Sequence, residues 1–353
     1  MKIINFYTLL MANRTFLRLA GYCFALMLLL SATTSCTTWK LGTHGQRKIE
    51  GKTYVIVGAS SGFGRGVAEE LGKCKANVVL AARRTELLEA IADTIRAHGG
   101  KATVVTMDIS KPEDVQRLAE NAVAAYKTID VWINMAGVGA VGRFWEIPAQ
   151  DQARIIDVNL KGFIYGSQSA VAIFIKQKYG VLINMGSVDS ETPMAYHASY
   201  TASKAGVRNL SLALGQELRL NGFKDIKVVT IEPWAVDTPW WRHAANYSGV
   251  EPKMALMDEP YKVVNAVLRK SLRPKKIVPV GWKAKTSSFM ANVFPRFNEH
   301  ITANVSQRYQ MEMPPAAPTT DGAIYKPMKE GEGVDDGVDE RMKKEKKERR
   351  KNN

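Results

Sequence analysis

A serine, a tyrosine and a lysine lie within the segment 187–204 at a spacing that could support proton transfer. Tyr200 and Lys204 are four positions apart, so in a helix their side chains share one face. A free tyrosine titrates near pH ~10, and an ammonium group one turn away favours the phenolate. We therefore predict that Tyr200 is a general acid or base and that Lys204 lowers its pKa toward the working range.

Ser187 closely follows an apolar run, 181–185, that predicts a buried strand. A hydroxyl at the carboxyl end of that strand could hydrogen-bond a substrate carbonyl held beside Tyr200. The tyrosine–lysine spacing alone is weak evidence, because any exposed helix can carry it. The serine at this offset, together with the glycine loop described next, makes an ordinary solvated helix the poorer interpretation.

A glycine-rich turn follows the β-branched run 53–57 and precedes a helical stretch that begins at Arg65. Such a strand, turn and helix form a phosphate-binding device, because glycine admits the phosphate to the backbone and the helix N-terminus supplies N–H donors. The spacing is GxxxGxG, so the general GxGxxG fingerprint does not match directly. The predicted cofactor-binding residues of this turn are Gly58, Ser60, Ser61, Gly62 and Gly64.

The second apolar run, 77–81, ends at Ala82 and Arg83. An NAD site usually has a carboxylate near this position to bind the ribose 2′-hydroxyl, whereas a basic residue suits the 2′-phosphate of NADP. The sequence therefore favours NADP(H) over NAD(H), with Arg83 as the residue that binds the 2′-phosphate.

Short apolar runs alternate with helical stretches through most of the chain. The predicted strands are 53–57, 77–81, 102–107, 129–133, 181–185, 226–231 and 276–280. Apolar strands separated by helices predict an α/β fold with a single Rossmann-like, doubly wound parallel sheet.

At this point the motifs resemble the short-chain dehydrogenase/reductase family over roughly residues 50–282. The matching features, in order and at the family's spacing, are VGASSGFG at 57–64, Asp108, Asn134, Asn159, Ser187, Tyr200-Thr-Ala-Ser-Lys204 and Pro233 to Thr238. The resemblance implies hydride transfer between NADP(H) and a carbonyl or alcohol.

The resemblance also implies a role for each matched residue. Tyr200 would be the general acid/base, Lys204 would also bind the nicotinamide ribose, and Ser187 would orient the carbonyl. Asn159 would position a proton-relay water. The implied cofactor contacts are Asp108 near the adenine, Asn134, Pro233, and Thr238 near the nicotinamide amide.

Two departures from the family pattern concern the cofactor site. Met135 replaces the second asparagine of Asn-Asn-Ala-Gly, and Trp234 replaces the glycine of Pro-Gly. The first removes an amide that helps to hold the central sheet, and the second places an indole beside the nicotinamide pocket. They motivate a second hypothesis, a membrane-associated NADP-binding scaffold with little or no turnover.

The segment after Trp234 is rich in large apolar side chains, namely Trp240, Trp241, Met254, Leu256 and Met257. These residues favour a bulky hydrophobic substrate. Alternatively, they only cover the end of the sheet. His197, three positions before Tyr200, could line the pocket, but a lone histidine in a loop is more often an ordinary surface residue, and we favour that interpretation.

The formal charge of +15 resides largely in the termini: residues 341–351 contain eight Lys/Arg against two Glu, and residues 1–50 contain six against one. The middle of the chain has no basic, aromatic-interleaved motif, so nucleic acid is not a predicted partner. Cys23, Cys36 and Cys74 give neither a disulfide framework nor metal-ligand spacing, so no metal site is predicted. The oligomeric state stays open, a homo-oligomer included.

The N-terminal residues 1–36 read as a signal peptide or a membrane anchor. Fourteen uncharged, mostly apolar residues, 19–32, follow Arg18 and are short for a spanning helix, which needs about 20. Thr34-Ser35-Cys36 resembles a degenerate bacterial lipobox, which would make Cys36 the lipidated residue of an exported lipoprotein. The alternative is an uncleaved anchor with the catalytic domain facing the cytosol. We expect membrane association either way, and the cytosolic orientation is favoured because NADPH is a cytosolic metabolite.

The predicted organisation is a linker over 37–50, a catalytic domain over 51–282 and a basic, apolar extension over 283–312. The extension could lie on a membrane surface or cover the substrate cleft. Residues 313–353 are rich in proline, glycine and charge, which predicts a disordered tail.

Overall fold

The computed structural model describes residues 41–352. The signal peptide or anchor predicted for residues 1–36, with Cys36, lies outside the described residues. Within 41–352, none of the helices combines the length and apolar character needed to cross a membrane.

Seven parallel strands form the central sheet, in the order β3-β2-β1-β4-β6-β7-β9. Their bounds are β1 Thr53–Val57, β2 Asn77–Ala82, β3 Lys101–Thr106, β4 Val131–Asn134, β6 Gly180–Met185, β7 Ile226–Pro233 and β9 Ile277–Val280. Every residue of β1 is buried, as expected for a central strand covered by helices on both faces. The predicted doubly wound parallel sheet is confirmed.

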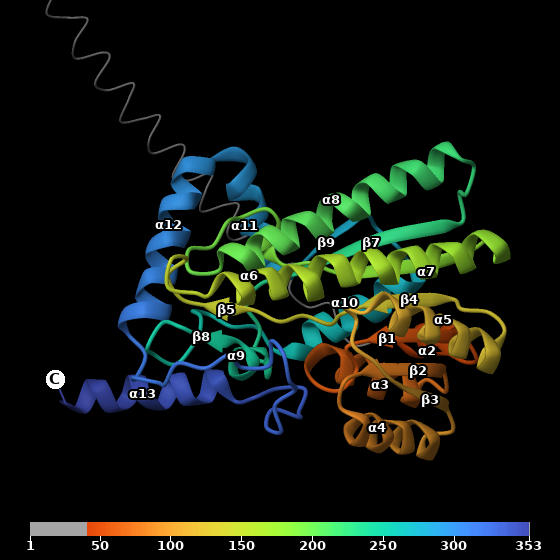
Figure 1. The fold of residues 1–353 in the computed structure, drawn as a ribbon, viewed down its shortest axis with the longest axis horizontal. Coiled ribbons are helices and arrows are strands. Elements are labelled where there is room, and N and C mark those ends of the chain that lie inside the picture. Colours follow the sequence, from red (N-terminus) through yellow and green to blue (C-terminus); the bar gives the residue numbers. More distant parts are fainter. Residues whose placement is uncertain (1–40, 353) are drawn as a thin grey trace, which may run out of the picture. The chain divides into compact units, whose positions relative to one another are not determined.

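Helices cover both faces of this sheet (Figure 1). One set packs together as α3 Gly62–Lys73, α4 Thr85–Ala97 and α10 Pro260–Leu272. The other contains α5 Pro112–Tyr126, α6 Ala149–Ile156, α7 Gly162–Gln177 and α8 Ala198–Leu220. Since the connections leave β1 and β4 toward opposite edges of the sheet, their carboxyl ends form the crevice in which such folds bind ligands.

Several short elements around this crevice were not predicted. A π-helix, η1 Asp157–Lys161, joins α6 to α7, and a 3₁₀ turn, η2 Val188–Ser190, follows β6. Strands β5 Ala140–Val141 and β8 Ala245–Asn246 form a small parallel pair, and α9 Trp240–His243 lies between β7 and β8. The predicted linker contains a helix, α2 Thr43–Ile49, whose Ile49 is fully buried.

The extension 283–312 falls in α11 Gly281–Val293, α12 Pro295–Gln307 and the π-helix η3 Arg308–Glu312. On the inner side of α12, Ser306 and Asn298 are buried and hydrogen-bond Met194 and Thr192. Large apolar residues are exposed on α11, on α12 and between them, among them Trp282, Phe289, Phe294 and Phe297.

The prediction that residues 313–353 are disordered is wrong for much of this segment. Ile324, Val334 and Val338 are buried, and the helix α13 Val338–Asn352 follows. The overall composition is that of a disordered chain, but these few apolar residues are spaced along it so that each meets the folded domain. The average composition of the segment therefore does not predict that these few residues are buried against the domain.

Candidate active site

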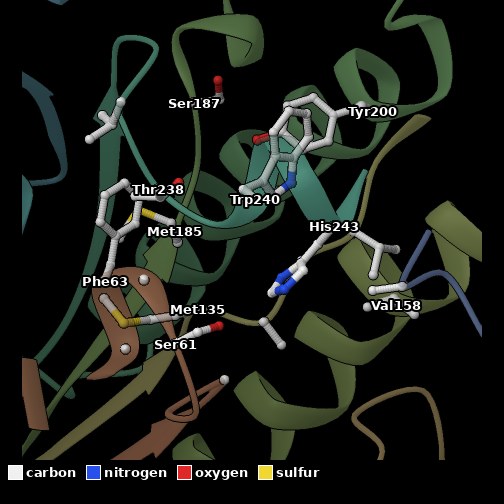
Figure 2. Close-up of a pocket in the computed structure, with 18 of the residues that line it drawn as sticks. Ser61, Phe63, Met135, Val158, Met185, Ser187, Tyr200, Thr238, Trp240 and His243 are labelled. Carbon is white, nitrogen blue, oxygen red and sulfur yellow. The ribbon is translucent and has the colours of Figure 1, made fainter. Parts of the chain in front are cut away.

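A cavity of about 250 Å³ lies at the carboxyl ends of the central strands. Figure 2 shows Ser61, Phe63 and Met135 toward one end of it, with Ser187, Tyr200 and Trp240 toward the other. Twelve of the predicted site residues line this cavity: Gly58, Ser60, Ser61, Gly62, Gly64, Arg83, Asp108, Ser187, Tyr200, Lys204, Pro233 and Thr238. The fold therefore brings the glycine loop and the tyrosine–lysine pair, distant in sequence, into one site.

Ser187, Tyr200 and Lys204 meet at one end of the cavity through β6 and α8. The ammonium group of Lys204 lies 5.6 Å from the centroid of the Tyr200 ring and donates a 2.8 Å hydrogen bond to the carbonyl oxygen of Met185. The hydroxyl of Ser187 donates to Asp189 at 3.1 Å, and the backbone N–H of Asp189 donates back to it at 3.2 Å. Asp189 is thus a buried carboxylate at the reactive end of the site.

The pKa of Tyr200 differs from the prediction. Burial and the negative charge of Asp189 raise the pKa of Tyr200 above its ordinary value, while a hydrogen bond with Ser187 opposes them. Burial lowers the pKa of Lys204 to about 8, against the charge of Asp189, which raises it. The prediction that Lys204 brings the Tyr200 pKa down toward neutrality is therefore wrong here. The arrangement retains the phenol as a proton donor.

We expect the rate of carbonyl reduction to fall as pH rises through about 8, where Lys204 loses its proton. The charged form of Lys204 stabilises the phenolate left after Tyr200 gives up its proton, and that stabilisation is present only below the lysine pKa. Tyr200 itself stays protonated across this range because its pKa is raised. The check is the pH profile of kcat/KM for reduction.

The matched variant for this profile is Asp189→Asn, which keeps the size of the side chain but removes its charge. Since Asp189 raises the pKa of Lys204, the variant should shift the alkaline limb to lower pH. An unchanged limb would assign the titration to another group.

Asn159 and Asn134 are the two predicted site residues outside the cavity lining. Asn159 is fully buried in η1, accepts from the backbone N–H of Val138 at 2.9 Å and donates to the hydroxyl of Ser203 at 3.1 Å. It therefore ties η1 to α8 three residues after Tyr200. The π-helix that carries it is a type of distortion often found at functional sites.

Asn134 links strands instead of facing the cavity. Its amide donates to Asn184 of β6 at 2.8 Å and accepts from the indole of Trp132 at 2.8 Å. This cross-strand contact holds β4 to β6, a role that the family pattern led us to associate with the position of Met135. Met135 itself lines the cavity.

The glycine loop needs its glycines for close backbone approach. Gly58 has a φ of 94°, and a Cβ there would lie 2.6 Å from the backbone nitrogen of Ala136. A Cβ on Gly64 would lie 2.0 Å from the carbonyl oxygen of Gly58. These contacts let the loop turn tightly into α3, whose N-terminus then faces the cavity.

The residues at the end of β2 fit the adenosine end of a phosphorylated dinucleotide. Arg83, Arg84 and Ser60 line the cavity together, and Arg84 donates to the Ser60 hydroxyl at 3.2 Å. Asp108 lies nearby and accepts from Arg154 at 2.7 Å. Although burial favours its neutral form, hydrogen bonds from Ser110 and Arg154 hold the pKa of Asp108 below its usual range. The two guanidinium groups and the serine supply the donors that a 2′-phosphate requires.

An aromatic cluster surrounds Tyr200 on its substrate side. The rings of Trp240 and Tyr200 have centroids 5.1 Å apart, and Trp240 meets Trp241 edge-on at 5.0 Å. Trp234, Trp241 and Met254 also line the cavity, whereas Leu256 is exposed. The predicted apolar surface is therefore present, although Leu256 and Met257 do not line the cavity.

His197 is buried, so the interpretation of it as a surface residue is wrong. Its Nδ1 lies 3.5 Å from Asp189, and its ring centroid is 6.1 Å from that of Tyr200. It lines the cavity, the alternative that its position before Tyr200 had suggested, because Trp240 and Trp241 of α9 and Asp189 of η2 pack around it.

Sequence reasoning missed other residues of the cavity. Asp189 lies two positions after Ser187, and no spacing rule separates it from the other polar residues of that loop. Met194 and His243 line the cavity, as do three residues of the predicted disordered tail, Ala323, Pro327 and Met328.

The chain is similar to known proteins in both sequence and structure. The family model for short chain dehydrogenase matches residues 52–247. The uncharacterised oxidoreductase YxnA of Bacillus subtilis is 29% identical over 282 residues, which cover 79% of each chain. The 3beta-hydroxysteroid dehydrogenase 1 of Eggerthella lenta is 37% identical over 195 residues, 54% of this chain and 73% of that protein. The structure of a metagenomic short-chain oxidoreductase in complex with NADP shares 30% identity with a TM-score of 0.53, over 63% of this chain and 91% of that chain.

Proposed function

Because the chain belongs to the short-chain dehydrogenase family and is an oxidoreductase of that type, we propose that it interconverts a carbonyl and an alcohol with NADP(H). The observation that carries the proposal is the convergence of Ser187, Tyr200 and Lys204 with the glycine loop in one cavity. Arg83, Arg84 and Ser60 favour NADP(H), and a structural relative is described in complex with NADP.

In reduction, bound NADPH supplies the hydride, and the protein's own residues handle the proton. Tyr200, kept as a phenol by burial and by Asp189, donates its proton to the oxygen that becomes the alcohol. Lys204 in its charged form stabilises the resulting phenolate. Ser187 orients the carbonyl, and to do so its hydroxyl must turn from Asp189 toward the substrate. The raised pKa of Tyr200 keeps it in the protonated form that reduction requires at neutral pH.

The substrate that suits this site is bulky and apolar. Trp234, Trp240 and Trp241 line the cavity next to Tyr200, while α12 contacts Met194 and η3 contacts Met254. A relative that is 37% identical bears the name of a hydroxysteroid dehydrogenase, so a polycyclic ketone is one candidate.

The test is NADPH consumption against a panel of ketones and aldehydes that increases in size from acetone to steroid ketones. We expect turnover that rises with apolar bulk. Absence of turnover on every member, with intact NADPH binding, would instead favour a nucleotide-binding scaffold. Met135 and Trp234, both of which line the cavity, are the observation that motivates this second candidate.

We also propose that the protein associates with a membrane. The proposal rests on the apolar stretch 19–32 and on the exposed residues Trp282, Phe289 and Phe297 of α11 and α12. The pKa of Lys270 is lowered, first by burial and then by the positive charges of neighbours such as Lys275 and Lys285. Such a cluster of basic residues suits a surface that binds anionic lipid.

Mass spectrometry of the protein from the membrane fraction distinguishes the modes of attachment. An intact N-terminus supports an uncleaved anchor, the outcome that we expect. A diacylglyceryl Cys36 start identifies an exported lipoprotein. Recovery of the full-length protein only in the soluble fraction would overturn both.

A further inference from the structure

Residues 320–338, which we call the C-terminal strap, cross the adenosine end of the cavity (Figure 1, blue segment before α13). The strap is held at both ends. Thr320 exchanges two backbone hydrogen bonds with Asn246 of β8, and the backbone N–H of Val338 donates to Asp237 at 2.9 Å. Ile324 is fully buried between them. The strap is therefore part of the folded domain.

The strap contacts the residues expected to bind the 2′-phosphate. Arg83 donates to the carbonyl oxygens of Ala323 at 2.8 Å and Tyr325 at 3.0 Å. Arg84 donates to those of Met328 at 3.3 Å and Gly331 at 3.4 Å. The strap carbonyl oxygens thus accept hydrogen bonds from guanidinium N–H groups that would otherwise be available to a phosphate.

Two further contacts extend this pattern toward the helix N-terminus. The backbone N–H of Gly62, the first residue of α3, donates to the carbonyl oxygen of Gly333 at 2.9 Å. Arg65 donates to the carbonyl oxygen of Glu332 at 3.0 Å. Residues 330–336 contain four acidic side chains and no basic one, so this part of the strap is anionic, as the cofactor is.

We propose that the C-terminal strap is a specificity element that competes with the 2′-phosphate of NADPH for Arg83 and Arg84. This inference rests on the proposed cofactor function. NADH has no 2′-phosphate and can bind with the strap contacts of Arg83 and Arg84 intact, whereas the Gly62 contact affects both cofactors alike. NADPH must exchange them for its own, so the strap reduces the preference for NADPH that Arg83 and Arg84 would otherwise confer.

Glycines in the strap allow it to be loosened without being removed. Gly322 has a φ of 55°, and a Cβ there would lie 2.4 Å from the carbonyl oxygen of His243. Gly331 has a φ of 71°, and its Cβ would lie 2.6 Å from Nε2 of His243. Gly322→Ala and Gly331→Ala should therefore push the strap away from α9. The matched control is Gly222→Ala, which has a φ of 82° but nothing within 4 Å of the added Cβ.

The first measurement is the dissociation constant of each cofactor for the full chain, by quenching of tryptophan fluorescence. We expect Gly322→Ala and Gly331→Ala to tighten NADPH binding by about tenfold, the effect of freeing a charged guanidinium from its hydrogen bonds to the strap carbonyls. NADH binding should change by less than about threefold, a difference of about 0.65 kcal/mol. Gly222→Ala should change neither, and retained NADH binding shows that the variants fold.

The second measurement is hydrogen exchange of peptides from 320–337 in the wild-type chain. Saturating NADPH should increase exchange there, because it displaces the strap, whereas NADH should leave it unchanged. Protection by NADPH, or weaker NADPH binding in the loosened variants, would show that the strap clamps the cofactor and would overturn the proposal. Equal changes for both cofactors would overturn it too. If neither cofactor binds any variant or the wild type, the proposed function itself fails.

Discussion

Replacing Tyr200 by phenylalanine is expected to lower kcat for carbonyl reduction by about 10²–10⁴-fold, the usual contribution of a positioned general acid. The phenol hydroxyl is the proton donor of the proposed reaction, and its raised pKa keeps the proton in place at neutral pH. NADPH affinity should stay within a few fold, because it depends mostly on the glycine loop, Arg83 and Lys204. Single-turnover kinetics and a binding titration on the same preparation separate the two effects.

The matched control for this variant is Tyr165→Phe, which removes a phenol from α7 outside the cavity lining. It should retain wild-type turnover. If Tyr200→Phe keeps most of kcat, the proton comes from another group, and the catalytic assignment is wrong.

Replacing Arg83 by alanine is expected to weaken NADPH binding more than NADH binding. A guanidinium–phosphate contact is worth about 1.5–3 kcal/mol, or roughly one to two decades in Kd. In the full chain the loss should lie near the lower end of that range, since Arg83 also gives up its bonds to Ala323 and Tyr325 when NADPH binds. Parallel titrations with both cofactors provide the measurement.

Arg96→Ala is the matched control, because Arg96 lies on α4 in an exposed ion pair with Asp93. It should affect neither cofactor. Combining Arg83→Ala with Gly322→Ala tests for coupling: if the strap and the phosphate compete for Arg83, loosening the strap should increase the loss caused by Arg83→Ala. Equal losses of NADPH and NADH affinity in the single variant would show that Arg83 does not bind the 2′-phosphate.

The protein's central sheet could be predicted because its signals are local. Continuous apolar strands such as 53–57 must be covered on both faces, and helices between them leave a parallel sheet as the consistent arrangement. The carboxyl ends of parallel strands lie at one edge, which brings the glycine loop after β1, Arg83 after β2 and Ser187 after β6 together. The sequence by itself thus determined the fold and the convergence of twelve predicted site residues on one cavity.

Only the tertiary structure decided the electrostatics of that cavity. The helix places Lys204 near Tyr200, as its spacing predicts, but burial sets the direction of both pKa shifts, and the charge of Asp189 reinforces it at Tyr200 and opposes it at Lys204. Burial of a side chain depends on every element packed around it. The local spacing of tyrosine and lysine therefore could not predict whether the phenol or the phenolate is favoured.

The contacts of the C-terminal strap could not be predicted from sequence patterns. Ala323 lies 240 positions from Arg83 along the chain, yet its carbonyl oxygen accepts from that guanidinium. Backbone carbonyl groups are the same in every residue, so no motif marks the ones that will meet an arginine. A segment with disordered composition acquires its structure from a few buried anchors, Ile324 and Val338 among them, and only the folded domain supplies the surfaces that bury them.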